Sequence, residues 1–323
     1  MNKNELYLGI DTSCYTTSLA AITAEGVIHT KKMLDVKSGE CGLRQSDALF
    51  QHVKNMPLLF EEMEKSLDFG EFDDVTVTVS SRPRSVDGSY MPVFMAGQSF
   101  AKVVAKSLNA KYREVSHQDG HIMAAIYSCR KYSILEEPFL VYHLSGGTSE
   151  LLLCKWCGDM FDCRIVGGTK DLPAGQFIDR IGVRCGMDFP CGKYIDYSAV
   201  NFGGDKPKVK FCVNEGYINF SGEETRYERM LESGADRDMV AYSVMKCISE
   251  SVKKSVEYAR CEYGVNNVLM VGGVSASTFL RDSFADIPSV YFADKDFSTD
   301  NAVGVCELGR WLSKQTEKQF MEK

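Results

Sequence analysis

One order of predicted elements occurs twice along this chain, and this duplication constrains the fold more than any other feature. Residues 5–33 read as three short strands, followed by a helical segment at 46–67, a strand at 73–81, a helix at 93–109 and a strand at 111–116. The pattern restarts with strands over residues 138–168. Pro57 is expected to kink or interrupt the first helix. Two copies of a β-β-β-α-β-α arrangement predict an α/β protein of two similar domains.

Each copy opens with a strand hairpin whose turn is rich in small and hydroxyl-bearing residues, "GIDTSCYTTS" and "LSGGTSE". Such a turn presents backbone N–H groups and hydroxyls that suit a phosphate, although an ordinary hairpin turn has a similar composition. A third turn, "VGGVSAS", lies between a strand and a helix, where the first amides of the helix face outward. Two facing copies would place two phosphate sites across one cleft.

The stretch "SHQDGHIMAAIYS" contains two of the five histidines, His117 and His121. Residues four apart lie on one face of a helix, so both imidazoles can bind the same metal ion. Gln118 replaces the general-base glutamate of the zinc-protease pattern H-E-x-x-H. The alternative is an ordinary helix start, with Ser116 as the N-cap and Asp119 in the first turn. The spacing alone leaves both interpretations open.

Composition indicates a soluble, cytoplasmic protein. The net charge is −7, which argues against unaided binding to nucleic acid. The N-terminus does not resemble a signal peptide, and no apolar run is long enough for a membrane span. The twelve cysteines are scattered and read as reduced thiols. Cys154 and Cys157 form a C-x-x-C that is either a redox or zinc pair or two cysteines on a β-hairpin.

Eight ordered motifs together resemble the tRNA threonylcarbamoyladenosine transferase family, TsaD and its relatives, formerly called O-sialoglycoprotein endopeptidases. The motifs are "GIDTSC", "HQDGH", "LSGGTSEL", "AGQFIDR", "FPCGKYID", "FSG", "GGVSAS" and "TDNAVG". The resemblance implies the actin-like ATPase fold of actin, sugar kinases and Hsp70, with two duplicated domains around a cleft. The expected domains are 1–116 and 117–298. The second would carry most of the metal and nucleotide site, and a closing helix at about 299–315 would pack back on the first.

The resemblance also implies the site residues. His117, His121 and Asp300 would bind one divalent transition metal, iron or zinc. Residues 145–149 would form the substrate loop, and Asp179, Gly192 and Asp196 would hold the ribose and base. Ser277 falls where the family has an asparagine near the nucleotide. The full set expected to bind an adenine nucleotide or adenylate is Asp11, Ser145, Gly146, Gly147, Thr148, Ser149, Asp179, Gly192, Asp196, Gly272, Gly273 and Ser277.

Several positions depart from the family pattern. Tyr15 and Thr16 replace two acidic residues of the opening turn, and Thr148 replaces a histidine. The family's G-P-G segment reads "RPR", so Arg82 and Arg84 are possible anion-binding residues or solvated loop arginines. The family's F-S-G-L-K reads "FSGEE", with Glu223 and Glu224 in place of the last two residues. These departures predict a divergent paralogue.

The resemblance implies a metal-dependent transfer of a threonylcarbamoyl or related carbamoyl group from an adenylate to an acceptor such as tRNA adenosine. The metal would act as a Lewis acid, and the sequence requires no separate nucleophile. The alternatives are an O-carbamoyltransferase-like paralogue with another acceptor and a non-catalytic nucleotide-binding partner protein. By the same resemblance, a protein of the same fold or a small ATPase is a possible partner. Binding of tRNA is possible but is not supported by the charge, and no membrane is expected.

Overall fold

The computed structural model describes residues 4–13, 15–36, 43–297 and 302–321, without the side chains of Asp296 and of residues 317–321. The chain divides into two compact units. Unit 1 comprises Met1–Arg130, Cys157–Phe161 and Thr299–Lys323, and unit 2 comprises Lys131–Trp156 and Asp162–Ser298. The division falls after Arg130 and not after residue 116, because α3 (His117–Cys129) packs along α9 (Val303–Met321) in unit 1.

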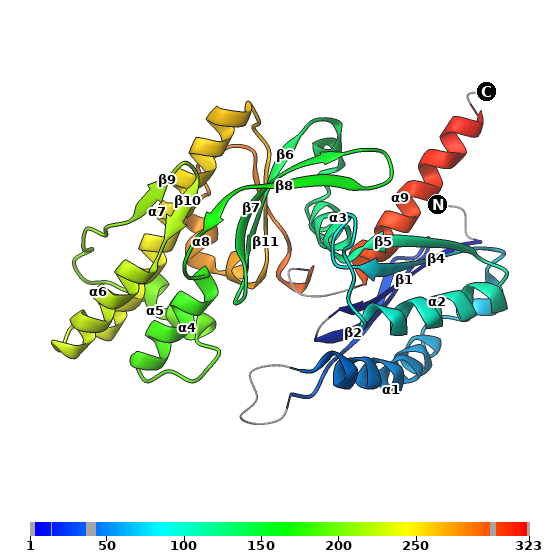
Figure 1. Cartoon of the computed structure of the whole chain (residues 1–323), viewed down its shortest axis with the longest axis horizontal. Coiled ribbons are helices and arrows are strands. Elements are labelled where there is room, and N and C mark those ends of the chain that lie inside the picture. The colour runs from blue at the N-terminus through cyan, green and yellow to red at the C-terminus, as the bar shows by residue number, and fades with distance from the viewer. Residues whose placement is uncertain (1–3, 14, 37–42, 298–301, 322–323) are drawn as a thin grey trace. The chain divides into compact units, whose positions relative to one another are not determined.

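Unit 1 is built on a five-stranded sheet with the order β3-β2-β1-β4-β5 (Figure 1). Strand β1 is antiparallel to β2, and β2 to β3, whereas β4 and β5 run parallel to β1. Every residue of β1 and β2 is buried, as expected for central strands that are covered on both faces. The strands are β1 (Glu5–Ser13), β2 (Thr16–Ile22), β3 (Val27–Met33), β4 (Asp74–Arg82) and β5 (Lys111–Ser116).

Helices cover both faces of this sheet, and alternate residues of β1 contact different helices. Thr12 Oγ1 donates to Val93 O at 3.0 Å and accepts from Gly97 N at 3.1 Å, on the side of α1 (Gln45–Glu64) and α2 (Phe94–Ser107). Gly9 lies against Cys306 of α9 on the opposite side. Helix α1 continues through Pro57 without the predicted interruption. Pro57 and Val53 are both exposed, so water can satisfy the carbonyl that proline leaves unpaired.

Unit 2 repeats this strand order within a seven-stranded sheet, β12-β11-β6-β7-β8-β10-β9. Its first five strands, read from β8 to β12, correspond to β3-β2-β1-β4-β5, as the duplicated pattern predicts. Strands β11 and β12 are parallel to β6, and β7 is antiparallel to it. The strands are β6 (Phe139–Leu144), β7 (Ser149–Trp156), β8 (Phe161–Thr169), β9 (Cys212–Asn214), β10 (Tyr217–Asn219), β11 (Val268–Val271) and β12 (Val290–Phe292).

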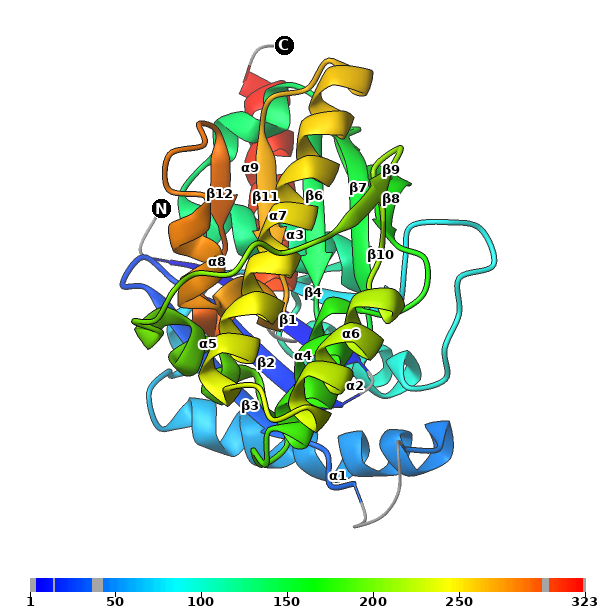
Figure 2. The ribbon, with the colours of Figure 1, turned by 90° about the vertical axis from the view of Figure 1, so that its left-hand side faces the viewer.

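The core of unit 2 lies between this sheet and a layer of helices, and the long α7 lies over the sheet (Figure 2). Leu140, Tyr142 and Leu151 of the sheet pack with Phe177 and Ile248 of the helices. Within the described ranges, no helix combines the length and apolar character that a membrane span requires. The helices are α4 (Ala174–Arg184), α5 (Gly192–Asn201), α6 (Ser221–Glu232), α7 (Arg237–Tyr263) and α8 (Thr278–Ser283).

Candidate functional site

The two histidines lie in the first turns of α3, and the local sequence explains why this helix starts where it does. Ser116 is the N-cap, and its hydroxyl accepts from Asp119 N at 3.1 Å. Gly120 is a poor helix former, but a Cβ at this position would lie 2.8 Å from Val305 of α9. A Cβ on Gly304 would in turn meet the backbone of Gly120 and of Ala124. The two glycines therefore let α3 and α9 approach backbone to backbone.

The imidazoles of His117 and His121 face each other, and both belong to unit 1. Their Nε2 atoms are 2.9 Å apart, and their ring centroids are 4.3 Å apart. His117 Nδ1 lies 3.2 Å from Oδ1 and 3.1 Å from Oδ2 of Asp11, which is fully buried in β1. The hydroxyl of Ser80 donates to the Asp11 carboxylate. Asp11 thus holds His117 by its Nδ1 edge, so that Nε2 faces His121.

This arrangement fits a metal-binding pair. Two ligand nitrogens at about 2.0–2.1 Å from one metal ion are about 2.9–3.4 Å apart, and a metal-bound histidine usually donates its other N–H to a carboxylate. A direct N–H···N bond between neutral rings has the same Nε2–Nε2 distance. In the described part of the chain, no three His, Cys, Asp or Glu side chains form one metal-binding group. The predicted third ligand, Asp300, lies outside the described residues.

The segment from Arg82 to Ser85 holds the start of α3. Gln118 N donates to Pro83 O at 3.0 Å, and Ser85 Oγ donates to Asp119 Oδ2 at 2.6 Å. Burial raises the pKa of Asp119, although its hydrogen bonds with Ser85, Ser116 and the Phe161 amide oppose this rise. The Arg82 guanidinium donates to Ser81 Oγ at 3.2 Å, and Arg84 is exposed. The two arginines therefore flank a proline whose carbonyl holds the amide next to His117.

In unit 2, the predicted glycine loops come together around the start of α4. Ser145 N donates to Thr148 O at 2.8 Å, which closes the turn between β6 and β7. A Cβ on Gly175 would lie 2.6 Å from Gly146 Cα, so the first turn of α4 packs directly on this loop. Gly272 has a φ of 91° and lies against Leu144 O, which leaves no room for a side chain. Ser149 is buried, and its hydroxyl accepts from Ala174 N at 2.9 Å.

The two carboxylates predicted to hold ribose and base are engaged with the backbone. Asp196 accepts from Thr278 N at 2.9 Å, from Phe279 N at 3.0 Å and from the Ser277 hydroxyl at 2.5 Å. Asp179 accepts from Cys191 N at 2.8 Å. Asp196 therefore joins α5 to the start of α8, and Asp179 joins α4 to the start of α5.

A pocket of about 720 Å³ lies among these loops and belongs entirely to unit 2. Six predicted residues are among those that line it, namely Gly146, Asp179, Gly192, Asp196, Gly273 and Ser277. The lining also contains four residues that were not predicted: Lys193 and Lys295, which add positive charge, and the exposed aromatic residues Phe189 and Tyr194. Phe189, Lys193 and Tyr194 belong to the motif "FPCGKYID", so the position of that motif in the sequence could have indicated them. Gly146, Gly192 and Gly273 have open space beside them, and the two lysines can contact an anionic group, although three carboxylates, Asp179, Asp188 and Asp196, also line the pocket.

The glutamates that depart from the family pattern form ion pairs on α6. Glu224 Oε1 lies 3.1 Å from Arg180 Nη1 of α4, and Glu223 Oε2 lies 3.3 Å from Arg226 Nη1. The acidic residues also lie in the first turn of α6, where the helix dipole favours them. These contacts explain the two glutamates by local pairing without a ligand.

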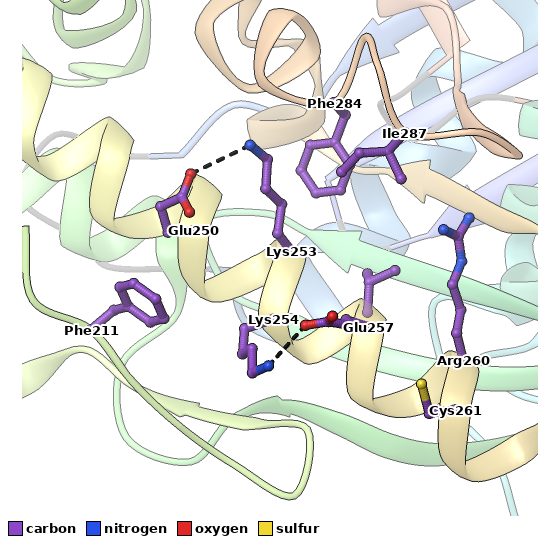
Figure 3. A pocket seen from close by; sticks show the side chains of 10 residues that line it. Phe211, Glu250, Lys253, Lys254, Glu257, Arg260, Cys261, Phe284 and Ile287 are labelled. Carbon is purple, nitrogen blue, oxygen red and sulfur yellow. Dashed lines mark hydrogen bonds and ion pairs between the residues drawn. The ribbon is translucent and has the colours of Figure 1, made fainter.

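A smaller pocket, about 370 Å³, lies along α7 (Figure 3). Its charged residues are engaged with protein groups. Lys253 pairs with Glu250 at 3.4 Å, Lys254 pairs with Glu257 at 2.8 Å, and Arg260 donates to the Pro288 carbonyl at 2.8 Å. Its remaining lining residues are Phe211, Val256, Cys261, Phe284 and Ile287. We assign no ligand to this pocket, because its charges are compensated locally.

Comparison with known proteins gives one family. A sequence profile described as "TsaD: tRNA N6-adenosine threonylcarbamoyltransferase" matches residues 23–305. The tRNA N6-adenosine threonylcarbamoyltransferase of Sulfurihydrogenibium sp. is 29% identical over 333 residues, which cover 98% of this chain and 91% of that protein. The enzymes of the same name from Riemerella anatipestifer and Thermus thermophilus are 29% and 28% identical, and the matches cover 95% of this chain and 93% of each of them.

Solved structures with the same fold are more distant in sequence. The activator of the 2-hydroxyisocaproyl-CoA dehydratase from Clostridium difficile, with bound ADPNP, has a TM-score of 0.52 at 14% identity, and 97% of each chain is covered. Full-length HypF in its phosphate- and nucleotide-bound form has a TM-score of 0.58 at 13% identity, over 98% of this chain and 56% of HypF. The actin-like ATPase fold predicted from the sequence is thereby confirmed. By its sequence, the chain belongs to the tRNA N6-adenosine threonylcarbamoyltransferase (TsaD) family.

Proposed function

We propose that this protein is a metal-dependent transferase that moves a threonylcarbamoyl or related carbamoyl group from an adenylate to an acceptor amine, with tRNA adenosine as the first candidate. Family membership supports the reaction class. The observation that carries the proposal is the pair of imidazoles on α3, whose Nε2 atoms face each other at 2.9 Å while the buried Asp11 holds His117 from behind.

In this proposal, His117 and His121 hold one iron or zinc ion, and Asp300 is the third ligand. A metal held there would supply Lewis-acid polarisation of the carbamoyl carbonyl. Asp11 keeps the Nδ1 proton of His117, which leaves the Nε2 lone pair free to act as a ligand. Ser80 orients Asp11 by donating to its carboxylate.

The adenylate is proposed to bind in the 720 Å³ pocket of unit 2. Lys193 and Lys295 attract its anionic groups, and Gly146 and Gly273 allow close approach of the ligand to the backbone. Asp196 acts here by positioning the start of α8, since its carboxylate already accepts from Thr278 N, Phe279 N and the Ser277 hydroxyl. Recognition of the base then depends on the exposed rings of Phe189 and Tyr194.

The departures from the family pattern support a change of acceptor or substrate. Arg82 and Arg84 replace glycines beside the start of α3, and Tyr15 and Thr16 replace two acidic residues of the opening turn. The proposed paralogue will therefore not replace the standard tRNA-modifying enzyme in a cell that lacks it. Arg82→Ala combined with Arg84→Ala should weaken anionic ligand binding without unfolding the protein. Full complementation by the wild-type chain alone would contradict the proposed change.

The decisive experiment follows AMP release from threonylcarbamoyl-adenylate by metal-loaded protein, with and without tRNA. His117→Ala should remove both turnover and close to one equivalent of metal, whereas Gln118→Ala in the same helical turn should retain both. If the threonylcarbamoyl group of the adenylate is labelled, appearance of the label on tRNA supports the family acceptor. AMP release without labelled tRNA indicates another acceptor. Nucleotide binding without turnover in metal-loaded protein would refute the transferase and favour a non-catalytic nucleotide-binding protein.

A further inference from the structure

Two cysteines of unit 2 that the sequence analysis did not pair lie in direct contact. Cys163 Sγ is 2.8 Å from Cys154 Sγ, and neither cysteine forms a disulfide. The C-x-x-C interpretation pairs Cys154 with Cys157, but Cys157 is exposed whereas Cys154 is fully buried. The structure therefore assigns Cys163 as the neighbour of Cys154.

The hairpin register explains this contact. Strands β7 and β8 are adjacent in the sheet, and Cys157 N donates to Met160 O at 2.9 Å. This bond closes a two-residue loop, so counting back three residues along each strand brings Cys154 opposite Cys163. By the alternation of an antiparallel ladder, this is a non-hydrogen-bonded pair, in which Cα atoms are about 4.5 Å apart. That spacing lies within the range of about 4.4–6.8 Å that a disulfide tolerates.

We propose that Cys154 and Cys163 form a reversible disulfide by exchange with a low-molecular-weight disulfide such as glutathione disulfide. Cys163 is partly exposed, so its thiolate attacks first. A Cys163–glutathione bond forms, the glutathione S–S bond breaks, and one reduced glutathione leaves. The Cys154 thiolate then attacks Cys163 Sγ and displaces the second glutathione. Two protein thiols are oxidised, and two electrons and two protons pass to glutathione disulfide, giving two reduced glutathiones.

The test is disulfide mapping by mass spectrometry. Reduced, folded protein is incubated with excess glutathione disulfide, the free thiols are alkylated, and the chain is cut after Lys155 and before Asp162. These two cuts separate Cys154, Cys157 and Cys163 onto different peptides. The expected product is a Cys154–Cys163 disulfide that excess reduced glutathione reverses.

Variants test the order of the two steps. Cys154→Ala should accumulate glutathione on Cys163, because no second thiol can displace it. Cys163→Ser should leave Cys154 unmodified, because it is buried. Cys157→Ser is the matched control and should form the disulfide as the wild type does. Alkylation of both Cys154 and Cys163 while the exposed Cys212 and Cys261 carry glutathione would overturn the proposal, as would a Cys154–Cys157 disulfide.

Discussion

Replacing Gly304 by alanine tests the close crossing of α3 and α9. The new methyl group would lie 2.6 Å from Ala124 N and 2.7 Å from Ala124 Cβ, and it would also meet Gly120 O. Ordinary contact begins near 3.4 Å, so the helices must separate by at least about 0.8 Å, the difference between 3.4 and 2.6 Å. Overpacking of this kind costs about 3 kcal/mol where backbone atoms are the obstacle. The better helix propensity of alanine offsets about 1 kcal/mol of this cost. The free energy of unfolding should therefore fall by about 2 kcal/mol.

The assay is urea unfolding followed by far-ultraviolet circular dichroism and by fluorescence of Trp311, which lies on α9. In a Trp156→Phe background, Trp311 is the remaining tryptophan and reports on unit 1. With a denaturant slope of about 2 kcal/mol per molar, the midpoint should fall by about 1 M.

Gly222→Ala in α6 is the matched control, because no atom lies within 4 Å of its added Cβ. This variant should be neutral or stabilised by up to about 1 kcal/mol. A Gly304→Ala protein as stable as the wild type would show that the helices do not touch at these glycines, and the account of Gly120 would then be wrong.

Three further substitutions have defined outcomes. Burial, together with the charge of Lys31, lowers the pKa of His29 to about 4. As the pH falls, the unfolded state therefore takes up a proton before the folded state does, and the free energy of unfolding decreases between about pH 6.5 and pH 4. His29→Gln should lose less stability than the wild type between pH 7 and pH 5 in denaturant titrations, and equal losses would refute this. Asp11→Asn should lower metal affinity about 10- to 100-fold in competition with a chelator, while unchanged affinity would mean that it does not orient His117. Asp196→Ala should destabilise the start of α8 by about 1–2 kcal/mol. The amide of Thr278 should then exchange its hydrogen at least about fivefold faster than in the wild type. An unchanged exchange rate would refute the anchoring role of Asp196.

The duplicated architecture was predictable because its signals are local. Alternating and continuous apolar runs mark strands, and the Ser116 cap followed by Asp119 marks the start of α3, whatever the rest of the chain does. The spacing of His117 and His121 likewise placed them on one helical face. The predicted interruption at Pro57 does not occur, because the cost of a proline in a helix depends on whether the freed carbonyl faces solvent or protein, and only tertiary structure decides that.

The partners of the site residues were beyond the reach of the sequence pattern, because they come from segments far apart in the chain. Asp11 meets His117 across 106 positions only because α3 packs against β4, which is the neighbour of β1 in the sheet. Asp196 anchors α8 across 82 positions to Thr278, a contact that the sequence pattern did not predict. The sequence by itself determined which elements form and in what order, since periodicity and caps act within a few residues. Tertiary packing alone decided which side chains share a site, because strand register and helix crossings set those distances.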